Sequence, residues 1–334
     1  MTTTTRPRRR RLLALVAGIS LAALFTAACA GTPASTASGA AAGGAAAPPK
    51  TLLAQPTPAP TLVLPQATPA PGGVPAGSAS VGDWRHAWQV VGLLRARPPR
   101  GRMVYYLGDS TARESLVSEA SWNRQLRQRG AHGVRAFLLA GHGQTFAMDA
   151  RIMRALPSSR GLALIGVSLS RFIGPPVRGS GAHPAAFPPG KPPRLSPWRQ
   201  HLYDARTIMT PAQKQGRVVH WRRSRTPAFF RYRKANLRAL GKLIADCRAR
   251  GLRPVLVELP LDLAAVRHRL DRPRASLRAG CRAVAARYGV RLLAFQLAPD
   301  LPGSDFFDIS HMVRAGAMRW QAGLSRWVIR LLPR

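Results

Sequence analysis

The chain has 334 residues, of which 51 are Lys or Arg and 13 are Asp or Glu, so its formal net charge is +38. A charge this positive favours anionic partners, such as phospholipid head groups or acidic envelope polymers. Beyond the first 30 residues the only cysteines are Cys247 and Cys281, and their spacing excludes a cysteine-based metal site.

The first 28 residues have the layout of a secretory signal. Four arginines, Arg8 to Arg11, run directly into the apolar stretch Leu12–Phe25, as in export signals. That stretch, at about 14 residues, is too short for a comfortable membrane span. We therefore expect residues 1–28 to be a signal peptide. Twin-arginine export and an uncleaved N-terminal anchor stay open as alternatives.

Ala28-Cys29 resembles the end of a bacterial lipobox, in which the cysteine is lipidated and becomes N-terminal after cleavage. The fit is imperfect, since Thr26 stands where such signals usually carry Leu. Cys29 is nevertheless the candidate lipidation site. We expect the protein to be exported in a bacterium, either as a lipoprotein on the outer face of the membrane or secreted to the cell envelope.

Residues 29–82 differ in composition from the rest of the chain. They are rich in Ala, Pro, Gly, Thr and Ser, and Lys50 is their only charge. Such a stretch has too few large apolar groups to offset its ordering entropy, so we expect a disordered linker. Its prolines keep it partly extended. It can serve as a tether to the envelope, although an ordinary linker fits equally well.

Residues 83–334 suit one domain with its own core. After an amphipathic stretch at 84–94, short apolar runs alternate with longer helical ones. Strands are expected at Met103–Leu107, Val134–Leu139, Leu162–Val167, Pro254–Glu258 and Arg291–Phe295. Helices are expected at Ala112–Arg129, Ala147–Leu156, Ala235–Arg250, Arg274–Tyr288 and about Val313–Leu332. This alternation predicts an α/β three-layer sandwich, with a parallel sheet of about five strands covered on both sides.

Two features of the domain leave alternatives open. Residues 174–230 are rich in Pro, Gly, Arg and His, and they predict a long inserted connection that contacts substrate, acts as a lid or is disordered. Cys247 and Cys281 fall in helices that flank one strand. A disulfide between them is plausible in an oxidising compartment, and two buried free thiols fit nearly as well.

Polar groups follow several of the expected strands. Gly108-Asp109-Ser110 comes after the first strand, and Gly141-His142-Gly143 comes after the second. Ser168 and Ser170 follow the third strand, and the loop after the fifth ends in Asp308-Ile309-Ser310-His311. Since ligands collect at the carboxyl ends of parallel strands, we expect these groups to meet at one edge of the sheet.

These residue types suit acyl transfer. A serine hydroxyl such as that of Ser110 needs a base within hydrogen-bond reach, and His311 can serve because imidazole titrates near neutral pH. Asp308, three residues earlier, can accept the other imidazole N–H and fix the tautomer. The backbone N–H groups of Ser110 and Gly141 can stabilise an oxyanion, together with one side chain.

The same residues resemble a family. Tyr106-Leu107-Gly108-Asp109-Ser110 looks like the first block of SGNH/GDSL hydrolases, Leu139-Ala140-Gly141 like the second, and Asp308-x-x-His311 like the last. The resemblance covers roughly residues 100–320. It implies a flavodoxin-like fold, no metal or organic cofactor, and hydrolysis or transfer of esters. Several relatives work on acyl groups of envelope polysaccharides.

One block departs from the family pattern. The family's third block has Gly-x-Asn-Asp, in which the Asn side chain donates to the oxyanion, and here Ser168 occupies the Asn position. A hydroxyl can donate, but it is shorter and rotates more freely. Losing one well-placed donor costs on the order of a hundredfold in rate, so a non-catalytic relative stays open.

Several of these residues have plainer interpretations. Asp308 could cap the last helix instead of, or besides, orienting His311, and Asp305 is a rival orienting carboxylate at an unusual spacing. His142 could contact substrate, but a surface loop histidine is the more ordinary explanation. For Arg113 and Glu114, on the helix after Ser110, a solvated ion pair is the default expectation.

Two functions therefore compete. The first is a serine esterase or O-acyltransferase that acts on acyl esters of an envelope glycan or lipid through Ser110, His311 and Asp308. The second is a non-catalytic module of the same fold that binds anionic envelope polymer. In either case we expect a monomer with an anionic membrane surface or polymer as partner. Nucleic acid would bind non-specifically, but export argues against it as the biological partner.

Overall fold

The structure is a computed structural model of the chain, and it describes residues 76–176, 208–294 and 301–332. The expected signal peptide, Cys29 and most of the linker therefore lie outside the described residues. The predicted linker boundary at residue 82 is wrong, because the first helix, α1, already begins at Ala76 (Ala76–Ala96).

The expected parallel sheet is confirmed. Its five strands run in the order β2-β1-β3-β4-β5, and every neighbouring pair is parallel. The strands are β1 Arg102–Gly108, β2 Val134–Ala140, β3 Gly161–Val167, β4 Leu252–Glu258 and β5 Arg291–Leu293. This is the flavodoxin-like doubly wound order, in which the strand sequence reverses beside β1 and the carboxyl ends of β1 and β3 form the ligand-binding edge.

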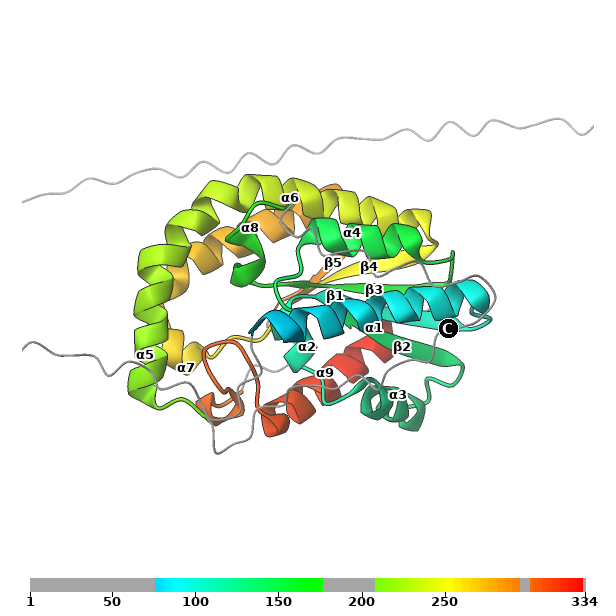
Figure 1. Cartoon of the computed structure of the whole chain (residues 1–334), viewed down its shortest axis with the longest axis horizontal. Helices are drawn as coiled ribbons and strands as arrows, with labels where there is room; N and C mark the ends of the chain where they lie inside the picture. The colour runs from blue at the N-terminus through cyan, green and yellow to red at the C-terminus, as the bar shows by residue number, and fades with distance from the viewer. Residues whose placement is uncertain (1–75, 177–207, 295–300, 333–334) are drawn as a thin grey trace, which may run out of the picture. The chain divides into compact units, whose positions relative to one another are not determined.

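Helices cover both faces of the sheet (Figure 1). They are α2 Ser110–Glu114, α3 Glu119–Gln128, α4 Phe146–Ala155, α5 Pro211–His220, α6 Thr226–Ala249, α7 Leu263–Val266, α8 Asp271–Arg287 and α9 Arg314–Leu331. Alternate residues of a strand point to opposite faces. Tyr105 of β1 accordingly packs into the core shared with α1, α4, α6 and α8, and Tyr106 into the core shared with α2, α3 and α9.

The helix expected at 112–129 is two helices. The chain leaves α2 after Glu114 and begins α3 at Glu119, and the Ser118 hydroxyl caps α3 by accepting a hydrogen bond from the Ser121 N–H (3.0 Å). Ser115 Oγ donates to the carbonyl of Ala112 (2.8 Å). Short polar side chains that bond locally favour helix ends over helix interiors, and this explains the break.

The end of the inserted region is helical and does not form the expected irregular connection. Thr210 and Gln213 form a capping box at the start of α5, with Pro211 as the first helical residue, which is a sequence signature of a helix start. The segment Trp221–Arg225 is a π-helix that joins α5 to α6. Pro227 follows closely and has no N–H to continue the regular ladder. Residues 177–207 of the insertion lie outside the described residues.

The possible disulfide between Cys247 and Cys281 is not formed, and both are buried free thiols. Helices α6 and α8 run in the same direction, because Gly280 lies against Leu237 and the later Tyr288 lies against Gly241. Cys281 is therefore level with Leu237, about 15 Å before Cys247 along the helix axis. A disulfide needs Cα atoms about 4.4–6.8 Å apart, so the helix register prevents it.

Among the helices in the described ranges, none combines the length with the apolar stretch that a membrane span requires.

Candidate active site

The turn after β1 places Ser110 at the sheet edge. Gly108 ends the strand where any Cβ would lie 2.4 Å from the Cβ of Ala112, so only glycine fits this close approach. Asp109 caps α2, its Oδ1 accepting a hydrogen bond from the Thr111 N–H (3.1 Å). Ser110 is the first residue of α2, and the first N–H groups of a helix have no intrahelical acceptor. Its backbone therefore presents a donor beside its own hydroxyl.

The loop that follows β5 brings His311 to the same place. Phe307 N–H donates to the His311 carbonyl (2.8 Å), which closes a tight turn. Within the turn, Asp308 Oδ1 accepts from the N–H groups of Ser310 and His311 (both 2.8 Å). His311 Nδ1 lies 2.9 Å from Asp308 Oδ2, and His311 Nε2 lies 3.0 Å from Ser110 Oγ. The structure thus brings together three residues that the sequence places up to 201 positions apart.

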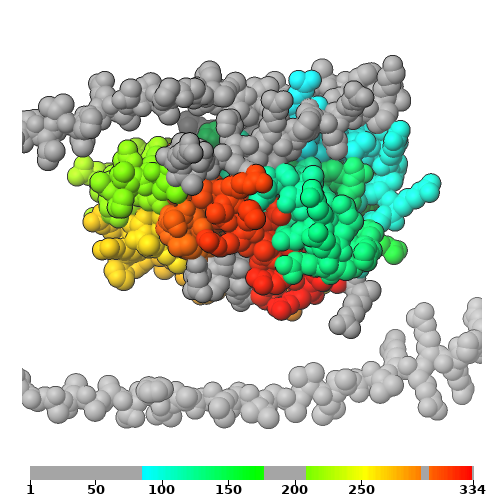
Figure 2. Space-filling model, turned by 90° about the horizontal axis from the view of Figure 1, so that it is seen from below, coloured from blue at the N-terminus to red at the C-terminus, as the bar shows by residue number. Residues whose placement is uncertain are grey.

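Figure 2 shows the segment that carries this loop, orange to red from residue 301 onward, between the yellow-green residues of α5 and the green residues of α3. Helix α9 packs beside α3, and Lys214 of α5 binds backbone carbonyls within the loop. The loop is therefore held from two sides.

The alternatives for Asp308 and Asp305 are resolved by these contacts. The N-cap residue of α9 is Val313, with no side-chain cap hydrogen bond, so Asp308 does not cap that helix. Asp305 is buried and pairs with Arg319. Of the two carboxylates, Asp308 is the one hydrogen-bonded to the imidazole of His311.

Electrostatics make the imidazole strongly basic. Burial alone would lower the pKa of His311, but the hydrogen bond to Asp308 and the negative charge of Glu114 outweigh it and raise this pKa to about 9. Burial would raise the pKa of Asp308, but the hydrogen bond and positive charge of His311 bring it down to about 2. These interactions favour the protonated imidazole next to a charged carboxylate.

The expected oxyanion donors are only partly available. The Gly141 N–H donates to the Gly108 carbonyl (3.2 Å), extending the β1–β2 ladder by one rung. The Ser168 hydroxyl donates to Asp109 Oδ2 (2.8 Å), and a hydroxyl has only one proton. The structure therefore directs the Ser168 proton to Asp109 instead of to the space above Ser110. The expectation that Ser168 replaces the family's Asn as a donor stays a prediction.

The sequence placed Ser170 at this edge of the sheet but indicated no role for it. Its hydroxyl also donates to Asp109 Oδ2 and lies 2.8 Å from Ser168 Oγ. The two serines of the altered third block thus hold the carboxylate that precedes the nucleophile. The available signal was the Ser-x-Ser spacing of Ser168 and Ser170 after a buried strand. His142, in the turn after β2, is exposed.

Arg113 and Glu114 are not a solvated ion pair, because both side chains are buried. Arg113 Nη2 lies 2.6 Å from Glu114 Oε1, and the Glu114 side chain is 1% exposed. Glu114 lies one turn after Ser110 on α2, and residues four apart share a helix face. Burial raises the pKa of Glu114, against the lowering effect of the His311 and Arg113 charges. A second carboxylate therefore faces the active-site imidazole.

A buried network fixes the turns after β2 and β3 relative to each other. Arg171 Nη2 pairs with Asp149 Oδ2 (2.6 Å), and both side chains are 0% exposed. Arg171 Nη1 donates to the Gly166 carbonyl (2.6 Å), and Gln144 Nε2 donates to Asp149 Oδ1. Sequence analysis missed this network. The sequence did contain a signal for it: Asp149 is a charged residue on the apolar face of its helix, between the buried residues Phe146 and Ile152.

No cluster of three or more potential metal ligands occurs within residues 76–176, 208–294 and 301–332.

Comparison with known proteins gives solved structures only. No family model matches the chain, and no curated protein matches it. One similar structure is TesA, at 16% identity and a TM-score of 0.39, covering 67% of this chain and 96% of TesA. Another is AlinE4, an SGNH-hydrolase family esterase, at 14% identity and a TM-score of 0.35, covering 70% of this chain and 98% of AlinE4.

A third is Axe2, an acetylxylan esterase from Geobacillus stearothermophilus, at 12% identity and a TM-score of 0.43, covering 68% of this chain and 94% of Axe2. At these identities and TM-scores the likeness carries no argument about activity.

Proposed function

We propose that the chain is a serine ester hydrolase or O-acyltransferase of the SGNH/GDSL kind. The observation that carries the proposal is the continuous hydrogen-bonded path from Ser110 Oγ to His311 Nε2 (3.0 Å) and from His311 Nδ1 to Asp308 Oδ2 (2.9 Å). A nucleophile, a base and a group that orients the base in this geometry define a catalytic triad by role.

The proposed reaction has two steps. The neutral imidazole accepts the Ser110 proton at Nε2 while Oγ bonds to the acyl carbon, and the oxyanion forms beside the Ser110 N–H. His311 then gives that proton to the leaving alkoxide, so the ester C–O bond breaks and an acyl-enzyme remains. Water or a sugar hydroxyl attacks the acyl-enzyme in the second step, losing its proton to His311 and restoring the Ser110 hydroxyl.

The proposed setting is the bacterial cell envelope, with acyl esters of an envelope glycan or lipid as substrate. The support comes from the sequence: the signal-like residues 1–28 with Cys29, and the net charge of +38, which favours anionic surfaces. Export brings such a domain to polymers that carry O-acyl groups.

A non-catalytic module that binds anionic envelope polymer is the second candidate. The observation in its favour is that the Gly141 N–H and the Ser168 hydroxyl are both engaged within the protein. An oxyanion hole with fewer donors loses on the order of a hundredfold in rate for each missing one.

A fluorophosphonate probe and p-nitrophenyl acetate separate the two candidates. An enzyme is labelled at Ser110 and hydrolyses the ester. Both activities are lost in Ser110→Ala and fall at least about a thousandfold in His311→Ala. Ser276→Ala, on α8, is the matched serine control and should retain both. Folded wild-type protein that neither reacts with the probe nor hydrolyses the ester would reject the catalytic proposal in favour of the binding module.

A further inference from the structure

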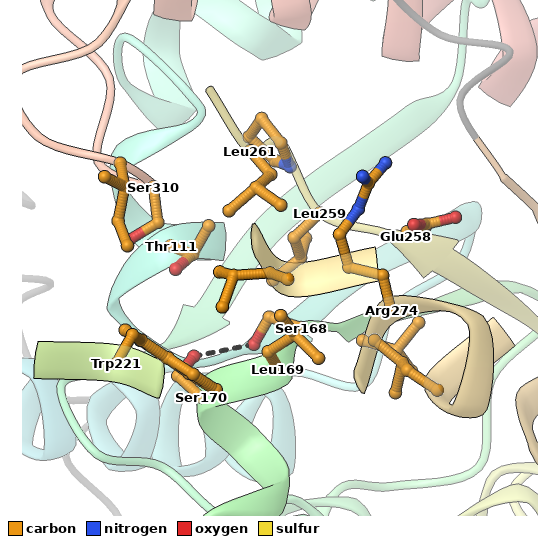
Figure 3. A pocket seen from close by; sticks show the side chains of 15 residues that line it. Thr111, Ser168, Leu169, Ser170, Trp221, Glu258, Leu259, Leu261, Arg274 and Ser310 are labelled. Atoms are coloured by element: carbon orange, nitrogen blue, oxygen red, sulfur yellow. Dashed lines mark hydrogen bonds between the residues drawn. The ribbon is translucent and has the colours of Figure 1, made fainter. Parts of the chain in front are cut away.

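A small cavity lies beside the triad at the carboxyl ends of β3 and β4. Thr111, which follows the nucleophile, and Ser310, which precedes the base, both line it (Figure 3). Ser168 and Ser170 line it from the end of β3. The cavity therefore adjoins the position that an acyl carbon bonded to Ser110 would occupy.

The walls of this cavity are mostly apolar. Leu169 comes from the end of β3, Leu259 and Leu261 follow β4, Leu277 belongs to α8, and Trp221 comes from the π-helical turn of the insertion (Figure 3). The polar residues of the lining are Thr111, Ser168, Ser170, Ser310, Glu258 and Arg274. Ser168 and Ser170 already bond to Asp109, and Glu258 pairs with Arg278. A glycan hydroxyl placed against the apolar walls would lose its water without a hydrogen-bond partner there, and this is costly. The cavity thus suits the acyl side of an ester better than its sugar side.

The size of the cavity limits the acyl group. Its volume is about 40 Å³, whereas an apolar cavity of about 150 Å³ is needed to hold benzene. Scaled from the six carbon atoms of benzene, this volume holds about two carbon atoms, the size of an acetyl group.

We propose that this cavity is the acyl-binding site, that it accepts the acetyl group, and that Trp221 forms the wall that excludes longer acyl groups. The proposal rests on the proposed esterase or acyltransferase function and names its substrate class.

The origin of Trp221 gives the insertion a role. Trp221 is the first residue of the π-helix Trp221–Arg225, where Thr226 Oγ1 and its N–H both bind the Trp221 carbonyl. A π-helical turn changes the direction in which its side chains point relative to a regular helix, and such turns recur at functional sites. Here the π-helical turn directs Trp221, an aromatic side chain of the insertion, over the apolar cavity at the sheet edge.

The test compares p-nitrophenyl acetate, butyrate and octanoate as substrates of the full-length protein. Wild type should hydrolyse acetate with a kcat/KM at least about tenfold above that for octanoate, with butyrate between the two. Trp221→Ala should raise the octanoate-to-acetate ratio about tenfold or more, because each accommodated methylene contributes roughly that factor. Trp327→Ala, a partly buried tryptophan of α9 that packs in the other layer, should leave the ratio unchanged.

If Trp221→Ala does not fold, a variant that fills part of the cavity provides a second test. Leu261→Phe narrows the cavity and should reduce butyrate hydrolysis relative to acetate several-fold. The acyl-site proposal would be overturned if wild type used octanoate and acetate equally, or if the ratios between the esters were unchanged in folded Trp221→Ala and Leu261→Phe. The proposed esterase activity would still stand. Absence of hydrolysis of every ester, with no labelling of Ser110, would overturn the function itself and the acyl site with it.

Discussion

The imidazole of His311 faces two carboxylates with different roles. Asp308 bonds to Nδ1 and sets the tautomer. Glu114 acts through its charge from the helix that carries the nucleophile, and Asp109 adds a smaller effect of the same sign. Arg113 is the positive group next to Glu114 and offsets part of that charge. Because the base must be neutral to accept the Ser110 proton, this surplus of negative charge should move activity toward alkaline pH.

The variant Glu114→Gln tests this electrostatic role. In wild type, kcat/KM should rise with pH as His311 loses its proton, with an apparent pKa well above the ordinary 6.5, toward about 9. Removing the Glu114 charge should shift that rise to lower pH by about one unit. Asp246→Asn removes a carboxylate that pairs with Arg154 outside the site and serves as the control. An unshifted profile in folded Glu114→Gln would show that Glu114 has a packing role alone.

The variant Ser168→Ala tests where the third-block hydroxyl acts. Since its proton goes to Asp109, and Ser170 also holds that carboxylate, kcat should fall less than about tenfold. The double variant Ser168→Ala/Ser170→Ala should lose more, because Asp109 then loses both hydroxyl donors. A loss of about a hundredfold or more in Ser168→Ala alone would be the signature of a direct oxyanion donor and would contradict this assignment.

At the scale of elements, the insertion is tied to the loop that carries the base. Lys214 of α5 is buried, and its Nζ lies 2.8 Å from Asp262 Oδ2, 2.7 Å from the Gly303 carbonyl and 3.0 Å from the Phe306 carbonyl. All three ammonium protons have acceptors. Asp262 in turn binds the loop through its N–H, which donates to the Ile309 carbonyl (2.9 Å). One ion pair therefore positions both ends of the turn around Asp308.

Lys214→Met and Lys214→Met/Asp262→Asn separate positioning from stability. The single variant leaves a buried carboxylate unpaired, which costs about 3–5 kcal/mol of unfolding free energy. The double variant removes that charge and should recover much of the loss. In both variants the backbone carbonyls of Gly303 and Phe306 lose the Lys214 ammonium as their hydrogen-bond donor. We therefore expect kcat to stay low while KM changes little. Denaturant unfolding and steady-state kinetics on the same samples measure the two effects. Recovery of kcat together with stability in the double variant would leave Lys214 a structural role only.

The sequence predicted those elements whose pattern is local. The strands were found because each is a short, nearly continuous apolar run, and β1 to β4 are buried along almost their whole length. The pairing of Ser110 with His311 followed from strand order, since both groups come after parallel strands. The burial of Glu114 and Lys214 was not predictable in this way. Glu114 interacts electrostatically with His311, 197 positions away, and Lys214 pairs with Asp262, 48 positions away. No local pattern records such partners.

At the scale of the whole molecule, positive charge is exposed on several helices of the described residues. Helices α5 and α6 and the π-helix between them expose a series of basic side chains, and Asp246, which pairs with Arg154, is the acidic residue of α6. Arg231, Lys234 and Arg238 are exposed and recur three and four residues apart, so they share one helix face. Like charges at this spacing destabilise a helix by a few tenths of a kcal/mol per pair. An anionic surface against this face would relieve that repulsion.

Charge reversal on this face tests whether it carries the affinity for an acidic polymer. With heparin as the probe, binding by wild type should weaken steeply between about 0.1 and 1 M salt, as the screening length falls from about 10 to 3 Å. Arg231→Glu/Lys234→Glu/Arg238→Glu should weaken binding at least about tenfold at low salt. The triple variant Arg124→Glu/Arg127→Glu/Arg129→Glu, on and just after α3, changes the net charge equally and should weaken binding less. Equal losses in the two variants would mean that overall charge, and not this helix face, holds the polymer.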